Sequence, residues 1–236
     1  MRFPQPLLQG KLISRYKRFF ADVMLPGNNP VTAHCANSGS MLSVQAPGSD
    51  VWISPATNPE RKLKYTWEII RIGDGLVGIN TSLPNGLVAE AIQGGIMPEL
   101  AGYTTVRREV KYGKNSRIDL LLERAGAPKC YVEVKNVTMK RDLSPDAACE
   151  FPDAVTARGA KHLVELSDAV REGHRAVMVF LVQRTDSKRF CVAADIDPGY
   201  ADGLKRALAA GVEVLCYGCS VTPLEIAVAK PLPMDL

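Results

Sequence analysis

The pattern of apolar residues changes near residue 80, and this change constrains the fold more than any other feature. Residues 7–80 contain short apolar runs at 8–13, 19–25, 31–35, 50–54, 65–72 and 76–80. Pro-Gly, Gly-Asn and Asp-Gly dipeptides separate these runs, as turns between strands require. Five or six short strands in so short a segment predict a small closed β-barrel similar to an OB-fold.

Residues 81–236 follow a different pattern, which predicts a mixed α/β domain. The expected helices cover 83–93, 153–172 and 199–210, and the expected strands cover 104–112, 117–123, 130–137, 175–183 and 212–217. Asp153 is expected to cap the second helix, and the apolar run 175–183 is typical of a strand buried on both faces. The chain is therefore predicted to be α/β overall, with a barrel domain over 1–80 and an α/β domain over 81–236. A length of 236 residues is sufficient for two domains.

Two short motifs match known binding patterns but lack the required context. Gly73-Asp-Gly75-Leu-Val-Gly78 has the spacing of a dinucleotide-binding loop, but a second apolar strand follows it instead of a helix. Asp74-Gly75 therefore indicates a hairpin turn. Cys216 and Cys219 have the spacing of half a zinc site or of a redox pair, but no second pair completes four ligands. Incidental thiols are the favoured interpretation.

The positive charge is concentrated in the first part of the chain. Residues 1–80 hold nine Lys and Arg against five Asp and Glu, whereas residues 81–236 hold twenty of each. A basic barrel suits a polyanion such as DNA, because contacts with phosphates release counterions. Arg15, Lys17 and Arg18 are the candidate DNA-binding residues of this segment, with a solvated charged face as the alternative.

The sequence gives no sign of a membrane protein. No apolar run approaches the ~20 residues of a membrane span, and the N-terminal segment has no apolar signal-peptide core. We expect a cytoplasmic protein that does not associate with membranes, and its six cysteines are expected to be reduced.

The strongest chemical signal is a pair of carboxylates and a lysine on two consecutive strands. Glu133 and Lys135 share one face of their strand, since residues two apart do so. A hairpin centred on Gly126 places Asp119 directly opposite Glu133, about 5 Å away between Cβ atoms. Facing carboxylates repel each other unless a cation lies between them, and hard oxygen ligands suit Mg²⁺ or Mn²⁺. The alternative is a ladder of surface salt bridges.

Asp-x13-Glu-x-Lys after a helix resembles the core of the PD-(D/E)xK nuclease superfamily. More narrowly, the chain resembles the sugar fermentation stimulation protein A family along almost its whole length. The matching segments are LISRYKRFFADV from residue 12, HCANSGSM from 34, PGSDVW from 47, EVKYG from 109, SRIDL from 116, YVEVKNVT from 131 and FPDAVTARGAKHL from 151. The resemblance implies an OB-like domain followed by a nuclease-like domain, DNA binding, and a link to the regulation of maltose and other sugar metabolism.

The superfamily resemblance also implies roles for individual residues. Asp119 and Glu133 would hold the metal with the Val134 backbone carbonyl, and Lys135 would act on the attacking water and on the charge of the transition state. Glu90 matches the position of a further acid in many members, but a solvent-facing helix glutamate is equally consistent.

Basic residues of the helix after the loop extend this hypothesis. Arg158, Lys161 and His162 share a helical face by their spacing and would contact a phosphate near the metal, with a solvated face as the alternative. Three functions remain open: a Mg²⁺-dependent DNA nuclease, a non-catalytic DNA-binding regulator of maltose metabolism genes, and a sugar- or nucleotide-binding module. The complete Asp/Glu/Lys set and the basic excess favour the first two.

Overall fold

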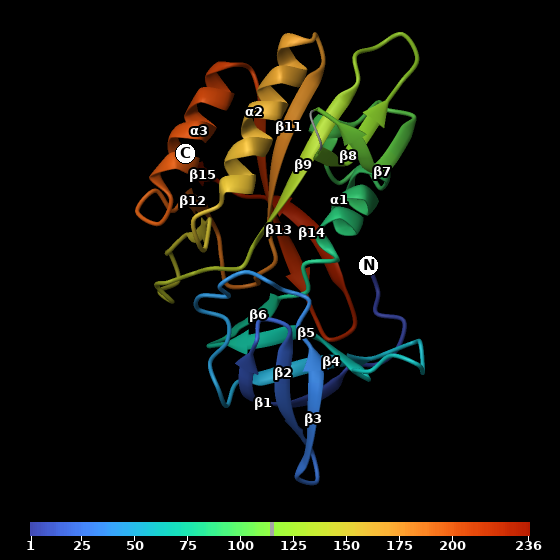
Figure 1. The fold of residues 1–236 in the computed structure, drawn as a ribbon, viewed down its shortest axis with the longest axis vertical. Coiled ribbons are helices and arrows are strands. Elements are labelled where there is room, and N and C mark those ends of the chain that lie inside the picture. The colour runs from blue at the N-terminus through green and yellow to red at the C-terminus, as the bar shows by residue number, and fades with distance from the viewer. Residues whose placement is uncertain (114–115) are drawn as a thin grey trace.

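A computed structural model describes residues 1–113 and 116–236 of the chain. Its first part is a closed barrel of short strands (Figure 1). The strands are β1 (Leu8–Tyr16), β2 (Phe20–Leu25), β3 (Asn29–His34), β4 (Asp50–Pro55), β5 (Tyr65–Ile72) and β6 (Gly75–Gly78). They pair in the order β3-β2-β1-β4-β5-β6, and a parallel contact between β3 and β5 closes the barrel.

The barrel encloses its own apolar core. Val23, Ile53, Trp67 and Ile70 point inward and are fully buried. Gly10 on β1 lies so close to β2 that an added Cβ would be 2.6 Å from Val23 Cγ1, so this crossing requires glycine. Ile72 pairs with Gly75 across the turn, which confirms the predicted hairpin and excludes the dinucleotide loop.

The second part is a six-stranded mixed sheet between helices. Its main elements are α1 (Pro84–Gln93), η1 (Pro98–Leu100), β7 (Thr105–Tyr112), β8 (Ser116–Glu123), β9 (Cys130–Val137), α2 (Ala157–Arg171), β11 (Arg175–Val182), α3 (Pro198–Ala209), β13 (Glu213–Val221) and β14 (Ile226–Pro231). The sheet order is β14-β13-β11-β9-β8-β7. The short strands β10 (Cys149–Phe151), β12 (Phe190–Val192) and β15 (Met234–Asp235) form a separate small sheet. These three strands and β14 were not predicted from the sequence.

Alternating residues of the sheet build two separate cores. On β11, Val177, Val179 and Leu181 pack on the face covered by α1, whereas Met178 and Phe180 pack on the face covered by α2 and α3. After Arg175 the strand is apolar because both of its faces are buried. The barrel and this mixed α/β domain together confirm the predicted fold class.

The start of α2 differs from the prediction. The helix begins at Ala157, and the Thr156 side chain caps it by accepting a hydrogen bond from the Gly159 amide at 3.0 Å. Asp153 does not cap the helix. Its carboxylate accepts hydrogen bonds from the Ser40 hydroxyl at 2.9 Å and from the Met41 amide at 3.1 Å. Asp153 therefore fastens the barrel loop after β3 to the second domain.

A backbone contact also joins the two domains at β6. The Gly78 amide donates to the Gln183 carbonyl at 2.9 Å, and the Thr185 amide donates to the Leu76 carbonyl at 3.1 Å. The segment after β11 thus continues the edge of the barrel, and the two domains are joined at β6 as well as at Asp153. Among the described residues, no helix has the length and apolar composition that crossing a membrane requires.

Candidate active site

The centre of the site is the place where β8 and β9 separate. These strands pair Leu120 with Val132 and Leu122 with Cys130, which confirms the register predicted from a turn at Gly126. The backbone pairing of β8 with β9 ends at Leu120. At the next residue a side chain makes the contact instead, because Asp119 Oδ2 accepts a hydrogen bond from the Val134 amide at 2.8 Å. This bond fixes the Asp119 carboxylate beside Val134 of β9.

Glu133 on β9 carries the second carboxylate and is almost fully buried, with 2% of its side chain exposed. Its Oε1 accepts a hydrogen bond from Lys135 Nζ at 2.7 Å and also contacts His162 Nδ1. Its Oε2 is buried and has no hydrogen-bond partner in the part of the chain that the structure describes. An unpartnered buried carboxylate oxygen is costly and needs an explanation, such as a bound cation.

His162 is a member of the site that the sequence did not identify as a partner of Glu133. Its Nδ1 contacts Glu133 Oε1, and Arg158 Nε donates to its Nε2 at 3.4 Å. The four-residue spacing of Arg158 and His162 on α2 was the available signal, and it was interpreted as a phosphate-binding face or a solvated face. Lys161 instead extends to Glu165, 3.5 Å away, and is 48% exposed.

Asn85 in the first turn of α1 was also missed. Its Nδ2 donates to Asp119 Oδ1 at 2.9 Å and to Glu109 Oε1 at 2.8 Å. The predicted ligand Glu90 lies five residues later, about 140° around the helix axis from Asn85. Its carboxylate pairs with the Met1 amino group at 2.8 Å and is 55% exposed. The structure therefore brings Asp119, Glu133 and Lys135 together but directs Glu90 elsewhere.

The two carboxylates have different environments, which shift their pKa values in opposite directions. Burial and the nearby Glu133 charge raise the pKa of Asp119 to about 6, although the Val134 amide and Lys135 oppose this shift. Burial alone would raise the pKa of Glu133, but the hydrogen bond from His162 and the charge of Lys135 outweigh it and lower the pKa. Strongly perturbed carboxyl groups of this kind are concentrated at functional sites.

The oxygen atoms present fit a divalent cation. Asp119 and Glu133 supply hard carboxylate ligands, and Glu133 Oε2 is unpartnered within residues 1–113 and 116–236. In the same ranges, no three His, Cys, Asp or Glu side chains are grouped to hold a metal ion by themselves. A cation between the two carboxylates would therefore take its other ligands from a backbone carbonyl, water and substrate, as Mg²⁺ commonly does.

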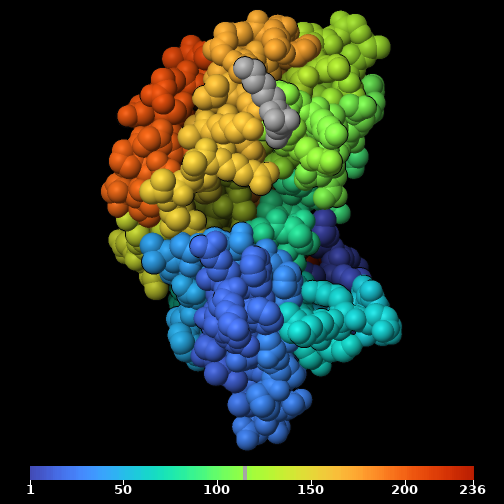
Figure 2. Space-filling model, viewed as in Figure 1, coloured from blue at the N-terminus to red at the C-terminus, as the bar shows by residue number. Residues whose placement is uncertain are grey.

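The site lies next to a hollow between the two domains. Figure 2 shows this hollow between the barrel, drawn in blue, and α2, drawn in yellow. A small cavity between the two domains is lined by Asn37 of the barrel and by Asn136 and Asp153 of the second domain. Asn136 directly follows Lys135, so this cavity lies at the end of the strand that carries Glu133 and Lys135.

The predicted basic residues of the barrel take two different positions. Lys17 and Arg18 form the exposed turn between β1 and β2, and Arg18 borders a cavity of about 480 Å³ together with Phe151 and Thr156 at the start of α2. Arg15 is directed inward. Its Nη2 donates to the Asn37 and Gly39 carbonyls, each at 2.9 Å, so it holds the loop after β3.

The two closely spaced cysteines do not form a joint site. Cys216 and Cys219 are three residues apart on β13, so their side chains point to opposite faces of the sheet. Cys216 packs in the core beneath α2 and α3, and Cys219 packs in the core beneath α1. Both are buried free thiols, and burial raises the pKa of Cys219 to about 12. This geometry excludes a shared zinc ion or a redox pair.

Comparison with known proteins agrees with the fold. The family description "SfsA N-terminal OB domain" matches residues 13–79, and "Sugar fermentation stimulation protein RE domain" matches residues 82–225. A sugar fermentation stimulation protein homolog of Rhodospirillum rubrum is 62% identical over 99% of both chains. A homolog of Paramagnetospirillum magneticum is 60% identical over all of this chain and 98% of the relative.

A solved structure is also similar to the whole chain. It is described as Pyrococcus furiosus SfsA in complex with Ca²⁺ and superimposes with a TM-score of 0.88 at 27% identity. The match covers 100% of this chain and 98% of the other, so both domains and their arrangement are shared.

Proposed function

This chain belongs to the sugar fermentation stimulation protein family, and we propose that it is a divalent-metal-dependent nuclease that cleaves DNA phosphodiesters. The observation that carries the proposal is the contact between Lys135 Nζ and Glu133 Oε1 at 2.7 Å, beside Asp119 and the unpartnered Glu133 Oε2. A lysine, two carboxylates and a free buried oxygen are the groups that metal-assisted hydrolysis of a phosphodiester requires. The Ca²⁺ in the Pyrococcus furiosus relative supports a divalent cation here.

Each residue of the site has a distinct part in the proposed mechanism. Asp119, Glu133 and the Val134 carbonyl would hold Mg²⁺ or Mn²⁺, which when bound lowers the pKa of a water and neutralises phosphate charge. Lys135 orients the attacking water and stabilises the charge that grows on the phosphate oxygens. His162 is a positioning residue, because it holds the Glu133 carboxylate that in turn holds Lys135.

The proposed division of labour follows the two domains. Residues 1–80 bind DNA and residues 81–236 cleave it. Lys17 and Arg18 are exposed on the barrel, and Arg158 and Lys161 are exposed on α2, so both domains present positive charge. We assign these four residues to phosphate contacts. Arg15 supports the same surface indirectly through the loop that it holds.

Cleavage by the wild-type protein is the direct test. We expect supercoiled, linear or single-stranded DNA to be cut in Mg²⁺ or Mn²⁺ and to remain intact in EDTA. A protein that binds DNA but cuts none of these substrates with any divalent metal would instead be the non-catalytic regulator of sugar metabolism genes. A protein that neither binds nor cuts DNA would contradict both functions.

Changing Lys17 and Arg18 together to Ala should weaken DNA binding in a salt-dependent manner. Each lost phosphate contact lowers the slope of log affinity against log salt by about one unit, so the double variant should lose roughly two. Titrations of labelled DNA from low to moderate salt measure this slope. Arg15 is left intact, because its removal would release the loop after β3. An unchanged slope would show that the barrel turn does not contact phosphates.

A further inference from the structure

Three ring side chains form a row across the outer face of the barrel. β1 and β2 pair Tyr16 with Phe20, and β2 and β3 pair Phe20 with His34. Residues paired directly across strands project from the same face of a sheet, so Tyr16, Phe20 and His34 lie side by side on this face. The rings of Tyr16 and Phe20 are stacked, with centroids 5.4 Å apart and planes 12° apart.

This aromatic row does not belong to the barrel core. Tyr16 is 39% exposed, and the adjacent Phe19 is 47% exposed. The hydroxyl of Tyr16 donates to Asp22 at 3.3 Å, which fixes the ring at the surface. Exposed, ordered aromatic rings that do not pack in a core are typical of a binding surface.

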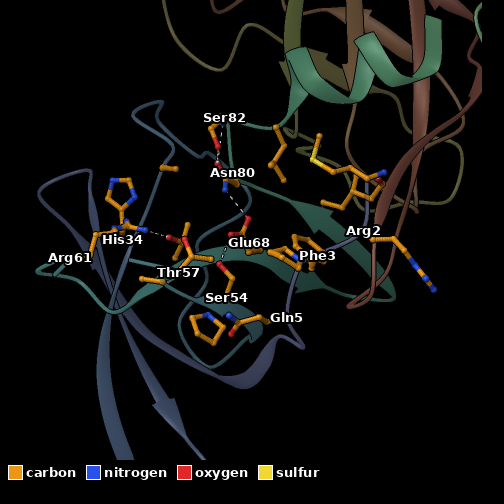
Figure 3. Close-up of a pocket in the computed structure, with 18 residues that line it drawn as sticks. Arg2, Phe3, Gln5, His34, Ser54, Thr57, Arg61, Glu68, Asn80 and Ser82 are labelled. Carbon is orange, nitrogen blue, oxygen red and sulfur yellow. Dashed lines mark hydrogen bonds between the residues drawn. The ribbon is translucent and has the colours of Figure 1, made fainter. Parts of the chain in front are cut away.

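Positive charge surrounds the aromatic row on both sides. Lys17 and Arg18 form the turn beside Tyr16, with φ angles of 46° and 63°, a backbone region that glycine or asparagine adopts more easily. At the other end, Arg61 lies beside His34 (Figure 3). Burial and the Arg61 charge lower the pKa of His34 from 6.5, so its ring is uncharged at neutral pH. The surface thus combines flat neutral rings with cationic edges, and the one carboxylate described on it, that of Asp22, accepts hydrogen bonds from the Tyr16 and Thr32 hydroxyls.

We propose that the aromatic row binds unpaired bases of single-stranded DNA by stacking, while Lys17, Arg18 and Arg61 contact its phosphates. Every base has a face that stacks on an aromatic ring, and a duplex hides those faces between base pairs. An uncharged sugar chain would also stack on the rings, but it would gain nothing from the three cations. This inference rests on the proposed nuclease function and names the form of DNA that the site receives.

The position of the row fits delivery of a strand to the site. Arg18 borders the cavity of about 480 Å³ whose other wall includes Thr156. Thr156 caps α2, and the same helix carries His162, which contacts Glu133. A strand held on the aromatic row therefore continues along the start of α2 toward Glu133 and Lys135.

Fluorescence anisotropy with labelled DNA tests the inference without cleavage, because EDTA removes divalent cations. The probes are an oligothymidylate of about 20 nucleotides, its duplex, and an abasic strand with the same number of phosphates. We expect the wild type to bind the oligothymidylate most tightly. Changing Tyr16→Leu and Phe20→Leu together should weaken this binding by roughly 5- to 100-fold and leave duplex affinity nearly unchanged.

The matched control is Leu8→Ala, at the far end of β1, because Leu8 is 38% exposed and lies outside the row. Its affinity for the oligothymidylate should equal that of the wild type. Melting curves establish that each variant is folded. If the double variant does not fold, two other measurements test the proposal. His34→Ala should weaken oligothymidylate binding, and the wild type should bind the abasic strand more weakly than the oligothymidylate.

Four results would overturn the inference: equal binding of the abasic strand, preference for the duplex, unchanged affinity in the folded double variant, or displacement of the oligothymidylate by maltoheptaose. None of them depends on cleavage. Single-strand binding without cleavage would remove the proposed nuclease function and leave this inference intact. If the protein cleaves DNA but binds unpaired bases no more tightly than a duplex, the nuclease function stands and this inference is wrong.

Discussion

Replacing Lys135 by Met should lower the rate of DNA cleavage by about 10²- to 10³-fold while changing DNA affinity little. The side chain of Lys135 is only 13% exposed, and its Nζ lies 2.7 Å from Glu133 Oε1, beside the proposed metal. A charge in this position acts mainly on the attacking water and on charge that develops in the transition state, so its loss affects the rate more than ground-state binding. Met keeps most of the side-chain volume but removes the charge and the hydrogen bond to Glu133.

Single-turnover cleavage at saturating enzyme measures this effect. Lys161→Met is the matched control, because Lys161 is 48% exposed on α2 and pairs with Glu165. It should weaken DNA binding modestly and leave the maximum rate nearly unchanged. Equal cleavage rates in the wild type and the Lys135 variant would show that Lys135 has no catalytic role and only forms a structural ion pair with Glu133. The folded state of this variant is expected to survive, since Glu133 retains the hydrogen bond from His162.

The sequence predicted the parts of the site that depend on strand geometry. Asp119, Glu133 and Lys135 follow from the two-residue alternation of strands and from a single turn at Gly126, which fixes the register of β8 and β9. The continuous apolar run of β11 predicted a strand covered on both faces for the same reason. The register follows these rules, but the cross-strand pairing ends at Leu120 and Val132. Asp119 is therefore not paired directly with Glu133, and its carboxylate instead accepts a hydrogen bond from the Val134 amide.

The contacts that the sequence did not predict join segments far apart in the chain. His162 and Glu133 are separated by 29 residues, and Asn85 and Asp119 by 34 residues. No short pattern indicates which polar residue of a helix will meet a strand, because this depends on how the helix packs on the sheet. Asp153 is a further example. An aspartate just before a helix can cap the helix or contact another domain, and the sequence around it is the same in both cases.

Glu133→Gln should remove divalent metal binding and leave the protein folded. The amide keeps the shape of the side chain, and its oxygen still accepts hydrogen bonds from His162 and Lys135. It lacks the negative charge that Glu133 Oε2 offers a cation. Loss of that charge also relieves the repulsion that disfavours ionised Asp119 in the metal-free protein. Mn²⁺ should therefore raise the melting temperature of the wild type but not that of the variant.

Glu90→Gln is the control that separates this site from a general loss of negative charge. It makes the same chemical change in the same domain, but Glu90 is 55% exposed and pairs with the Met1 amino group. Because Glu90 lies on a different side of α1 from Asn85, its variant should bind Mn²⁺ like the wild type in a calorimetric titration. Retained metal affinity in Glu133→Gln would place the metal elsewhere. Lost affinity in both variants would restore Glu90 as a ligand and require α1 to rotate toward the carboxylates when the cation binds.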